Sequence, residues 1–415
     1  MSIRYVKNAV AALSLSGLLF AASVESAAAA APIPGGWEAS ALGLPATQKI
    51  SQGAGVTVAV LDSGVLASHP AVKGRVTTGP DFFKDGLDES SPKWGVHGTA
   101  MASDVLKVAP QAKILSIRVL DESHEVRDKI KEGPNPLTEG IDYAVAHGAK
   151  VISMSLGDQF GLYSDSVTES IGYAVSHGVI LVASAGNSGD EGNDGGFPAG
   201  YPSVISVAAT QQGGGHADFS TVRTHNAVAA PGVGITNARK AGGFTKGDGT
   251  SPAAALTSGV VALMLSHNAK LTPAQTRSIL TGTAHHPAGG FNALVGYGQI
   301  NAAAAVKAAG NPPADRTAAV PYRGKEHLAA TDDVSKTSHP PMEQGLWIGG
   351  LGVAGVGALM LIVGLLMALL RRRSGAVVAG PGALPNGFPP QPNYQAQGQQ
   401  QPANPYAQQP PYQGQ

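Results

Sequence analysis

Short apolar runs alternate with helical patterns through the middle of the chain, and this alternation limits the fold more than any other feature. The runs lack the apolar–polar alternation of a half-exposed strand, so each is predicted to be a strand buried on both faces. They cover residues 56–61, 114–119, 151–154, 179–183 and 204–208. Residues 138–147 and 166–177 show helical spacing, and each is followed by a glycine, Gly148 or Gly178, as is common at helix C-termini. This order predicts an α/β fold with a doubly wound parallel sheet.

The N-terminal end carries a different apolar segment. Arg4 and Lys7 precede an apolar run at residues 9–22, and residues 27–31 are all alanine. A basic start, a short apolar stretch and small residues that suit cleavage predict a secretory signal peptide at residues 1–31. An uncleaved anchor helix is the alternative, but the run is short for crossing about 30 Å of hydrocarbon.

A second apolar segment near the C-terminus predicts a membrane span. Residues 346–370 contain no charged residue, and Arg371, Arg372 and Arg373 follow at once. The length predicts one transmembrane helix, and the three arginines predict that its C-terminal end faces the cytoplasm. The signal peptide requires the same topology. We therefore expect a single-pass protein of the cell membrane, extracytoplasmic between the two apolar segments.

Composition sets the remaining boundaries. Residues 371–415 carry no charge after Arg373 and consist mainly of Pro, Gln, Gly, Asn and Tyr, which predicts a disordered cytoplasmic tail. Residues 311–344 are rich in proline and polar residues and are interpreted as a linker. One folded domain remains, residues 32–310. Within it, the charged stretch 121–139 is predicted to be solvated surface.

Charge and cysteine content exclude several functions. Lys+Arg and Asp+Glu number 28 each, so the chain lacks the basic excess of a general nucleic-acid-binding protein. There is no cysteine, which excludes disulfides, cysteine-ligated metals and a cysteine nucleophile. We predict no metal ion and no cofactor, so any covalent catalysis must use another nucleophile.

Four short motifs place polar side chains at the ends of predicted strands or the starts of predicted helices. They are Asp62-Ser63-Gly64 after residues 56–61, His97-Gly98-Thr99 before residues 100–108, Ala185-Gly186-Asn187 after residues 179–183, and Gly249-Thr250-Ser251 before residues 252–267. Each has an ordinary explanation by itself, because Asp is common in turns and Ser is common at helix N-caps.

Together the four motifs supply a complete set of catalytic groups. Ser251 provides a nucleophile, His97 a base and Asp62 a carboxylate that can orient the base. Asn187 provides an amide donor for an oxyanion. Sites in such sheets form beyond the carboxyl ends of strands, where these residues are expected to lie. The chain order Asp, His, Ser differs from the orders of chymotrypsin and of the α/β-hydrolases.

With these motifs, the sequence resembles the subtilisin-like (subtilase) serine peptidases from about residue 37 to residue 309. The resemblance implies that Asp62, His97 and Ser251 are the catalytic triad and that Asn187 is the oxyanion donor. It also implies that the stretch Ser155-Leu156-Gly157 is an edge strand that binds the substrate. The stretches Tyr201-Pro202-Ser203 and Ala230-Pro231-Gly232 match the family as well, whereas Ala255 stands where many relatives have proline.

The order of signal peptide, peptidase domain, linker, single span and arginine stop is similar to that of the mycosins, the membrane-anchored subtilases of actinobacterial type VII secretion. This resemblance implies a serine endopeptidase that cleaves extracytoplasmic polypeptides beside a type VII secretion membrane complex. The alternative is a protein that mainly stabilises such a complex, with peptidase activity secondary or lost.

Overall fold

The computed structural model describes residues 32–121, 135–157, 164–193, 196–315 and 355–367. The predicted signal peptide, the predicted tail and most of the predicted linker lie outside these ranges. The chain divides into two units, Met1–Met342 and Glu343–Gln415. The first unit contains all the predicted site residues.

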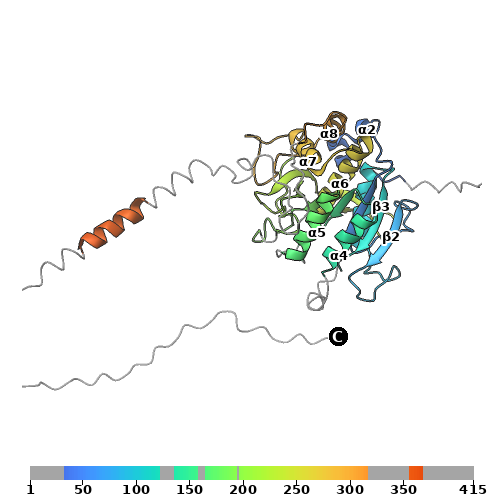
Figure 1. Ribbon diagram of the computed structural model, residues 1–415, viewed down its shortest axis with the longest axis horizontal. Coiled ribbons are helices and arrows are strands. Elements are labelled where there is room, and N and C mark those ends of the chain that lie inside the picture. Colours follow the sequence, from blue (N-terminus) through green and yellow to red (C-terminus); the bar gives the residue numbers. More distant parts are fainter. Residues whose placement is uncertain (1–31, 122–134, 158–163, 194–195, 316–354, 368–415) are drawn as a thin grey trace, which may run out of the picture. The chain divides into compact units, whose positions relative to one another are not determined.

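A seven-stranded parallel sheet forms the centre of the first unit (Figure 1). Its strand order is β2-β3-β1-β4-β5-β6-β7, and every neighbouring pair is parallel. The strands are β1 (Thr57–Asp62), β2 (Val76–Asp81), β3 (Lys113–Arg118), β4 (Val151–Met154), β5 (Ile180–Ser184), β6 (Val204–Thr210) and β7 (Asn226–Pro231). The predicted α/β fold is confirmed, and the five predicted strands are β1, β3, β4, β5 and β6.

Helices and one hairpin surround the sheet. The helices are α1 (Trp37–Ala41), α2 (Leu44–Thr47), α3 (Val96–Val108), α4 (Pro136–Ala146), α5 (Asp165–Ser176), α6 (Thr250–His267), α7 (Pro273–Gly282) and α8 (Ala302–Ala309). The hairpin pairs β8 (Ile235–Ala238) with β9 (Phe244–Gly247). Gly148 and Gly178 follow α4 and α5 with positive φ, as the helix-end pattern predicts.

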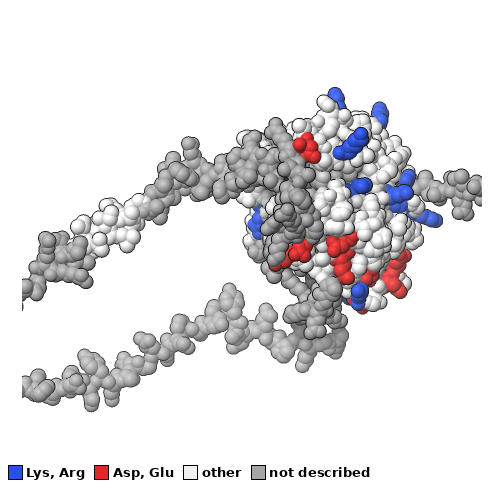
Figure 2. All heavy atoms as spheres, in the orientation of Figure 1, with Lys and Arg blue, Asp and Glu red and all other residues white. Residues whose placement is uncertain are grey.

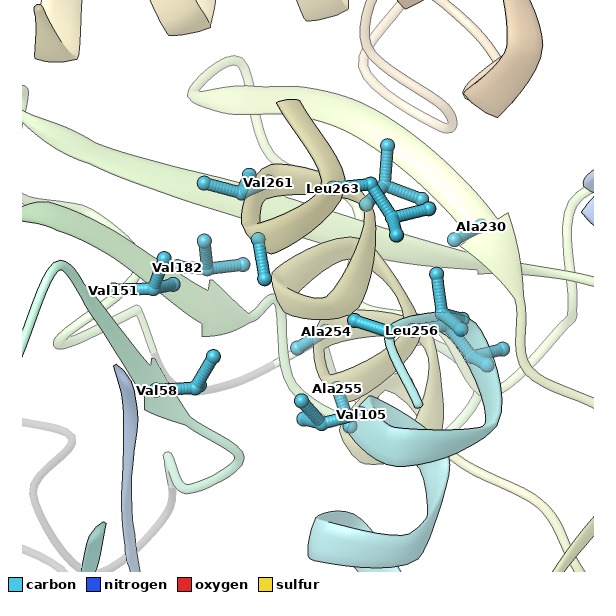
Figure 3. Packing of buried hydrophobic residues seen from close by; sticks show 14 of the residues in the cluster. Val58, Val105, Val151, Val182, Ala230, Ala254, Ala255, Leu256, Val261 and Leu263 are labelled. Carbon is cyan, nitrogen blue, oxygen red and sulfur yellow. The ribbon is translucent and has the colours of Figure 1, made fainter. Parts of the chain in front are cut away.

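Side chains of the strands alternate between two apolar clusters, one on each face of the sheet. In β1, Val58 and Val60 belong to the cluster with α3 and α6, whereas Ala59 and Leu61 belong to the cluster with α4 and α5. Figure 3 shows α6 packed on the first face, with Ala254 and Ala255 turned into the core. The helix continues unbroken through Ala255, the position that differs from many relatives. A sheet covered on both faces explains why its strands read as continuous apolar runs.

The interpretation of residues 121–139 as solvated surface is wrong at its two ends. Asp121 is buried beside Arg118, whose Nη2 lies 3.9 Å from Asp121 Oδ1. Leu137 in the first turn of α4 is also buried. Residues 122–134 lie outside the described ranges.

The predicted membrane span is described only in part. Residues 355–367 form a helix. In the part of the chain that the structure describes, no helix is both long enough and apolar enough to cross a bilayer. The rest of the 346–370 segment lies outside that part.

Candidate active site

The first half of the candidate site is an Asp–His pair at the carboxyl end of β1. Asp62 is the last residue of β1 and is fully buried. Both of its carboxylate oxygens lie 2.9 Å from His97 Nδ1, and Oδ1 also accepts a hydrogen bond of 2.7 Å from the Ser63 backbone N–H. The imidazole is partly exposed, with 32% of its side chain accessible. One ring nitrogen is therefore fixed by a buried carboxylate while the ring keeps an open side.

Close backbone packing holds His97 beside Asp62. A Cβ on Gly98 would lie 2.1 Å from the carbonyl oxygen of Gly64, so only glycine fits where α3 passes the turn after β1. The Gly98 N–H donates to Ser63 Oγ at 3.1 Å. The glycine in this motif thus sets the distance between the strand end and the helix that carries His97.

The second half of the site is the start of α6. Gly249 precedes the helix with φ of 150°, and its N–H donates to the Gly232 carbonyl at 2.8 Å. Ser251 lies in the first turn and is partly exposed. Its Oγ is 3.4 Å from the Ser155 carbonyl oxygen, and Ser155 Oγ donates to the Ser251 carbonyl at 3.0 Å. These contacts join the nucleophile candidate to the residue after β4.

Asn187 is anchored to the same helix start by its amide oxygen. Asn187 Oδ1 accepts hydrogen bonds from the Thr250 N–H at 2.8 Å and from Thr250 Oγ1 at 2.9 Å. Thr250 Oγ1 in turn accepts from the Gly186 N–H at 3.1 Å. Among the described residues, Asn187 Nδ2 has no hydrogen-bond acceptor. The amide is therefore oriented so that its oxygen accepts hydrogen bonds from Thr250 and its N–H groups can donate to another molecule.

The stretch Ser155-Leu156-Gly157, predicted as an edge strand, is not part of a strand in the structure. It follows β4 directly and has no sheet pairing among the described residues. Ser184 Oγ donates to the Leu156 carbonyl at 3.2 Å, which fixes the stretch against the end of β5. The residues lie where the sequence places them, beside Ser251, but no partner strand is present in the described chain.

Packing of α3 against α6 brings the two halves together. Gly259 of α6 lies so close to α3 that a Cβ there would be 2.6 Å from Val108 Cβ. Asp62, His97, Ser155, Asn187 and Ser251 therefore belong to one region, at the carboxyl ends of β1, β4 and β5. This is the edge at which parallel sheets bind ligands.

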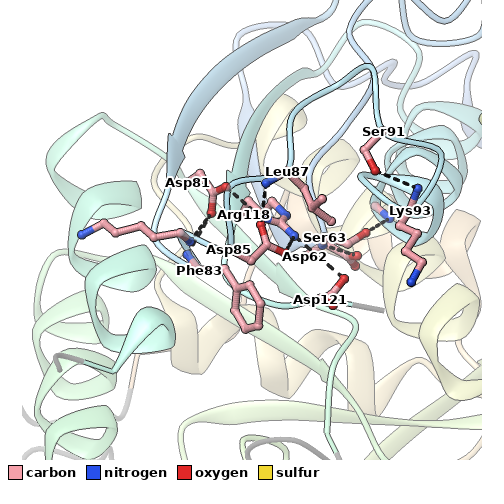
Figure 4. Close-up of polar contacts among 12 residues, drawn as sticks. Asp62, Ser63, Asp81, Phe83, Asp85, Leu87, Ser91, Lys93, Arg118 and Asp121 are labelled. Atoms are coloured by element: carbon pink, nitrogen blue, oxygen red, sulfur yellow. Dashed lines mark hydrogen bonds and ion pairs between the residues drawn. The ribbon is translucent and has the colours of Figure 1, made fainter. Parts of the chain in front are cut away.

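A charged group flanks Asp62 on the neighbouring strand β3 (Figure 4). Arg118 is the register partner of Asp62 and is 2% exposed. It binds Asp81 at 2.8 Å and both oxygens of Asp85 at 2.7 and 2.6 Å. The hydrogen bonds from Arg118 lower the pKa of Asp85. The group fastens the loop before α3 to the sheet edge next to the Asp–His pair.

Sequence reasoning missed the supporting roles of Thr250 and Ser63. Both stand inside the motifs, but nothing in a linear motif shows that Thr250 holds Asn187 or that Ser63 receives the Gly98 N–H. The hydroxyl residues that directly adjoin Asp62 and Ser251 in the sequence are the signal that could have indicated them.

Surface charge and possible metal ligands add little to the site. Within the described ranges, no three His, Asp or Glu side chains come together in a way that could hold a metal ion. On the face drawn in Figure 2, Lys and Arg form small separate patches among neutral atoms. The part of that face that grey atoms do not cover shows no continuous basic surface of the kind that binds a nucleic acid.

Comparison with known proteins gives a family match. Residues 53–298 match the Subtilase family. The chain is 36% identical over 263 residues to subtilisin NAT from Bacillus subtilis subsp. natto, which covers 61% of this chain and 66% of that protein. The chain thus spans about two thirds of the length of this relative.

Two solved structures of proteases are also similar to this chain. MycP1 from Mycobacterium smegmatis is similar with a TM-score of 0.55 and 27% identity, covering 67% of this chain and 86% of that one. The MycP3 protease from the type VII (ESX-3) secretion system is similar with a TM-score of 0.56 and 28% identity, covering 66% of this chain and 89% of that one.

Proposed function

The chain belongs to the subtilase family of serine endopeptidases, and from this membership we propose that it cleaves peptide bonds of extracytoplasmic proteins while anchored to the cell membrane beside a type VII secretion complex. The proposal has a catalytic part and a cellular part, which rest on different observations.

In the catalytic part, Ser251 attacks the substrate carbonyl carbon while His97 accepts the hydroxyl proton. His97 then gives this proton to the leaving amine, and water repeats the sequence to release the acyl group. Asp62 keeps the hydrogen of the imidazole on Nδ1, so that Nε2 is the basic nitrogen. The positions of both Asp62 oxygens as acceptors, each 2.9 Å from Nδ1, support this role.

Asn187 stabilises the negative oxygen that forms when Ser251 attacks. Its Oδ1 is occupied by Thr250, which leaves Nδ2 as the donor. One such donor contributes about 3–4 kcal/mol to transition-state stabilisation. The Ser251 backbone N–H, at the start of α6, serves as the second donor.

The substrate binds as an extended strand along Ser155, Leu156 and Gly157. This stretch has no strand partner in the described chain, so a peptide can pair with those of its main-chain groups that do not already bind Ser184 or Ser251. A strand added here runs past Ser251, because Ser155 already contacts that residue.

The observation that carries the catalytic proposal is the fully buried Asp62 carboxylate bound to the partly exposed His97. A buried carboxylate that fixes one imidazole nitrogen and leaves the ring open is the arrangement a general base requires. We expect a fluorophosphonate probe to label the full chain covalently and Ser251→Ala to remain unlabelled. Equal labelling of both proteins, or none of the wild type, would contradict the proposal.

The cellular part rests on the two apolar segments and on the similarity to MycP1 and MycP3. The signal sequence and the arginine stop both favour an extracytoplasmic peptidase domain with a cytoplasmic tail. The similarity to MycP3, a protease from a type VII secretion system, favours a type VII secretion complex as the partner.

Protease applied to intact protoplasts tests the topology. We expect it to remove the peptidase domain and leave a small tail fragment protected. Digestion of the tail with survival of the peptidase domain until lysis would overturn the localisation and the substrate class together.

A second candidate function is stabilisation of a membrane secretion complex without essential proteolysis. The similarity to MycP1, one structure of which is described as an essential component of the type VII (ESX-1) secretion system, favours it. Complementation of a deletion strain by Ser251→Ala separates the two functions. Restored secretion supports the stabilising role, and failure at normal protein level supports an essential cleavage.

A further inference from the structure

The end of α3 opposite His97 carries a buried charge cluster that the proposed mechanism does not use. Lys107 Nζ lies 2.9 Å from Glu38 Oε1 in α1 and 3.1 Å from Asp104 Oδ1 in α3, and it also donates to the Thr236 carbonyl in β8. The Glu38 and Asp104 side chains are fully buried, and that of Lys107 is 3% exposed.

The cluster has one positive group for two carboxylates. Glu38 Oε2 and Asp104 Oδ2 are buried, and neither has a hydrogen-bond partner in the described chain. If both carboxylates were ionised, the core would hold an uncompensated negative charge at high energetic cost. A proton on one carboxylate relieves that cost.

The cluster is also the polar link between the N-terminal segment and α3. Glu38 joins α1 to the helix, while Gln48, directly after α2, donates to the carbonyls of Lys107 and Val108 at 2.8 and 2.9 Å. Trp37 Nε1 donates to the Val233 carbonyl at 2.8 Å. Because His97 lies in the first turn of α3, whatever holds the far end of this helix also limits how the helix can shift.

We propose that Glu38, Lys107 and Asp104 form a proton-dependent clamp that fastens the N-terminal segment to the helix carrying His97 and holds it most tightly in acidic surroundings. Burial raises the pKa of Asp104 to about 7, with Lys107 opposing the rise and Glu38 adding to it. Burial disfavours the charge of Lys107, but the two carboxylates outweigh it and raise the pKa of Lys107.

The direction of the pH effect follows from these shifts. An unfolded Asp titrates near its ordinary value of 3.8. Between about 4 and about 7 the folded protein keeps a proton that the unfolded chain has lost, so stability contributed by this group falls as pH rises through that window and is constant above it.

The other charged groups that face the cluster are few. His97 shares α3 and acts on Asp104 from a distance. Lys246 of β9 is the register partner of Thr236, and its side chain is exposed. β8 contributes the Thr236 carbonyl and no charged side chain. A change in pH response after substitution in the cluster can therefore be attributed to the three clustered residues.

Thermal unfolding of the full chain in detergent micelles, followed by tryptophan fluorescence, tests the clamp without using peptidase activity. We compare wild type with Asp104→Asn from pH 4 to pH 8.5. The variant minus wild-type difference in Tm should increase by several degrees up to about pH 7 and then level off. Other groups that titrate in this range cancel in the difference.

Glu38→Gln provides a second test if Asp104→Asn does not fold. It leaves Lys107 and Asp104 as a simple pair, so Asp104 should lose its proton at lower pH. The Tm of the variant minus the Tm of wild type should therefore be larger at pH 8 than at pH 5. Glu169→Gln is the same change at an exposed position of α5, and its Tm difference from wild type should stay constant from pH 4 to pH 8.5. A constant difference for the cluster variants as well would overturn the clamp, whatever the outcome of fluorophosphonate labelling.

Discussion

The two halves of the candidate site are held by different forces. Asp62 and His97 are joined by a charged side-chain contact in a buried setting, with both carboxylate oxygens 2.9 Å from Nδ1. Ser251 and Asn187 are held mainly through backbone groups of α6 and of the chain after β4 and β5. The first half should therefore respond to loss of a charge, and the second to small changes in hydrogen bonding at a helix start.

His97→Ala is expected to have the largest effect, because it removes the base from the first half. Peptide hydrolysis should fall about a million-fold, the loss known for the corresponding change in subtilisin. The double variant His97→Ala with Ser251→Ala should lose scarcely more, since the two residues act as one unit. Additive losses measured by hydrolysis of the same peptide would separate the residues and contradict a joint mechanism.

Asp62→Asn tests whether charge governs the first half. An Asn side chain can still accept from the Ser63 N–H, but its amide would donate to His97 Nδ1 and place the imidazole hydrogen on Nε2, toward the substrate. We expect kcat to fall about 10,000-fold while the thermal unfolding transition keeps its shape. Asp165→Asn, the same change at an exposed site in α5, should retain wild-type activity. Full activity of Asp62→Asn would remove the charge argument.

Asn187→Ala probes the second half directly. It removes the free Nδ2 donor, so kcat should fall about 100- to 1,000-fold while KM stays near the wild-type value. A change confined to KM would show that Asn187 binds the ground state of the substrate instead of the oxyanion.

Thr250→Val makes the smallest change and sharpens the comparison. It keeps the backbone N–H bond to Asn187 Oδ1 but removes the Oγ1 bonds to Asn187 and Gly186. Loss of about 1.4 kcal/mol in positioning should lower kcat about tenfold. Combined with Asn187→Ala, it should have little further effect, and an undiminished tenfold loss in that background would show that Thr250 acts elsewhere.

The sequence revealed five strands of the main sheet that are apolar on both sides and missed β2 and β7. β2 lies at the sheet edge, has partly exposed residues throughout, and contains Gly79 and Pro80, so no apolar run marks it. The strand β7 is buried but consists largely of alanine with polar Asn226 at its start. The helix α7 could have been found from its capping box, in which Thr272 and Gln275 bond reciprocally.

The candidate site residues could be proposed from the sequence, whereas the contacts that hold them could not. Asp62, His97, Asn187 and Ser251 were predicted as site residues because their residue types and their positions after strands or before helices are local features. The strand predicted at Ser155-Leu156-Gly157 is unpaired chain in the structure, because sheet pairing depends on a neighbour that the stretch itself does not specify. The positioning of Asn187 by Thr250 depends on a contact across 63 residues.

From the sequence it was possible to predict five of the seven strands of the main sheet, the helices α3 to α6, the order of the candidate catalytic groups and the family resemblance, because periodicity, turn residues and motifs act over a few neighbouring positions. The tertiary structure alone decided which distant charges meet. Glu38 reaches Lys107 across 69 residues and Arg118 reaches Asp85 across 33. Such pairs form because closing the core forces buried charges to find partners at short range, and a linear pattern contains no record of which partner lies within reach.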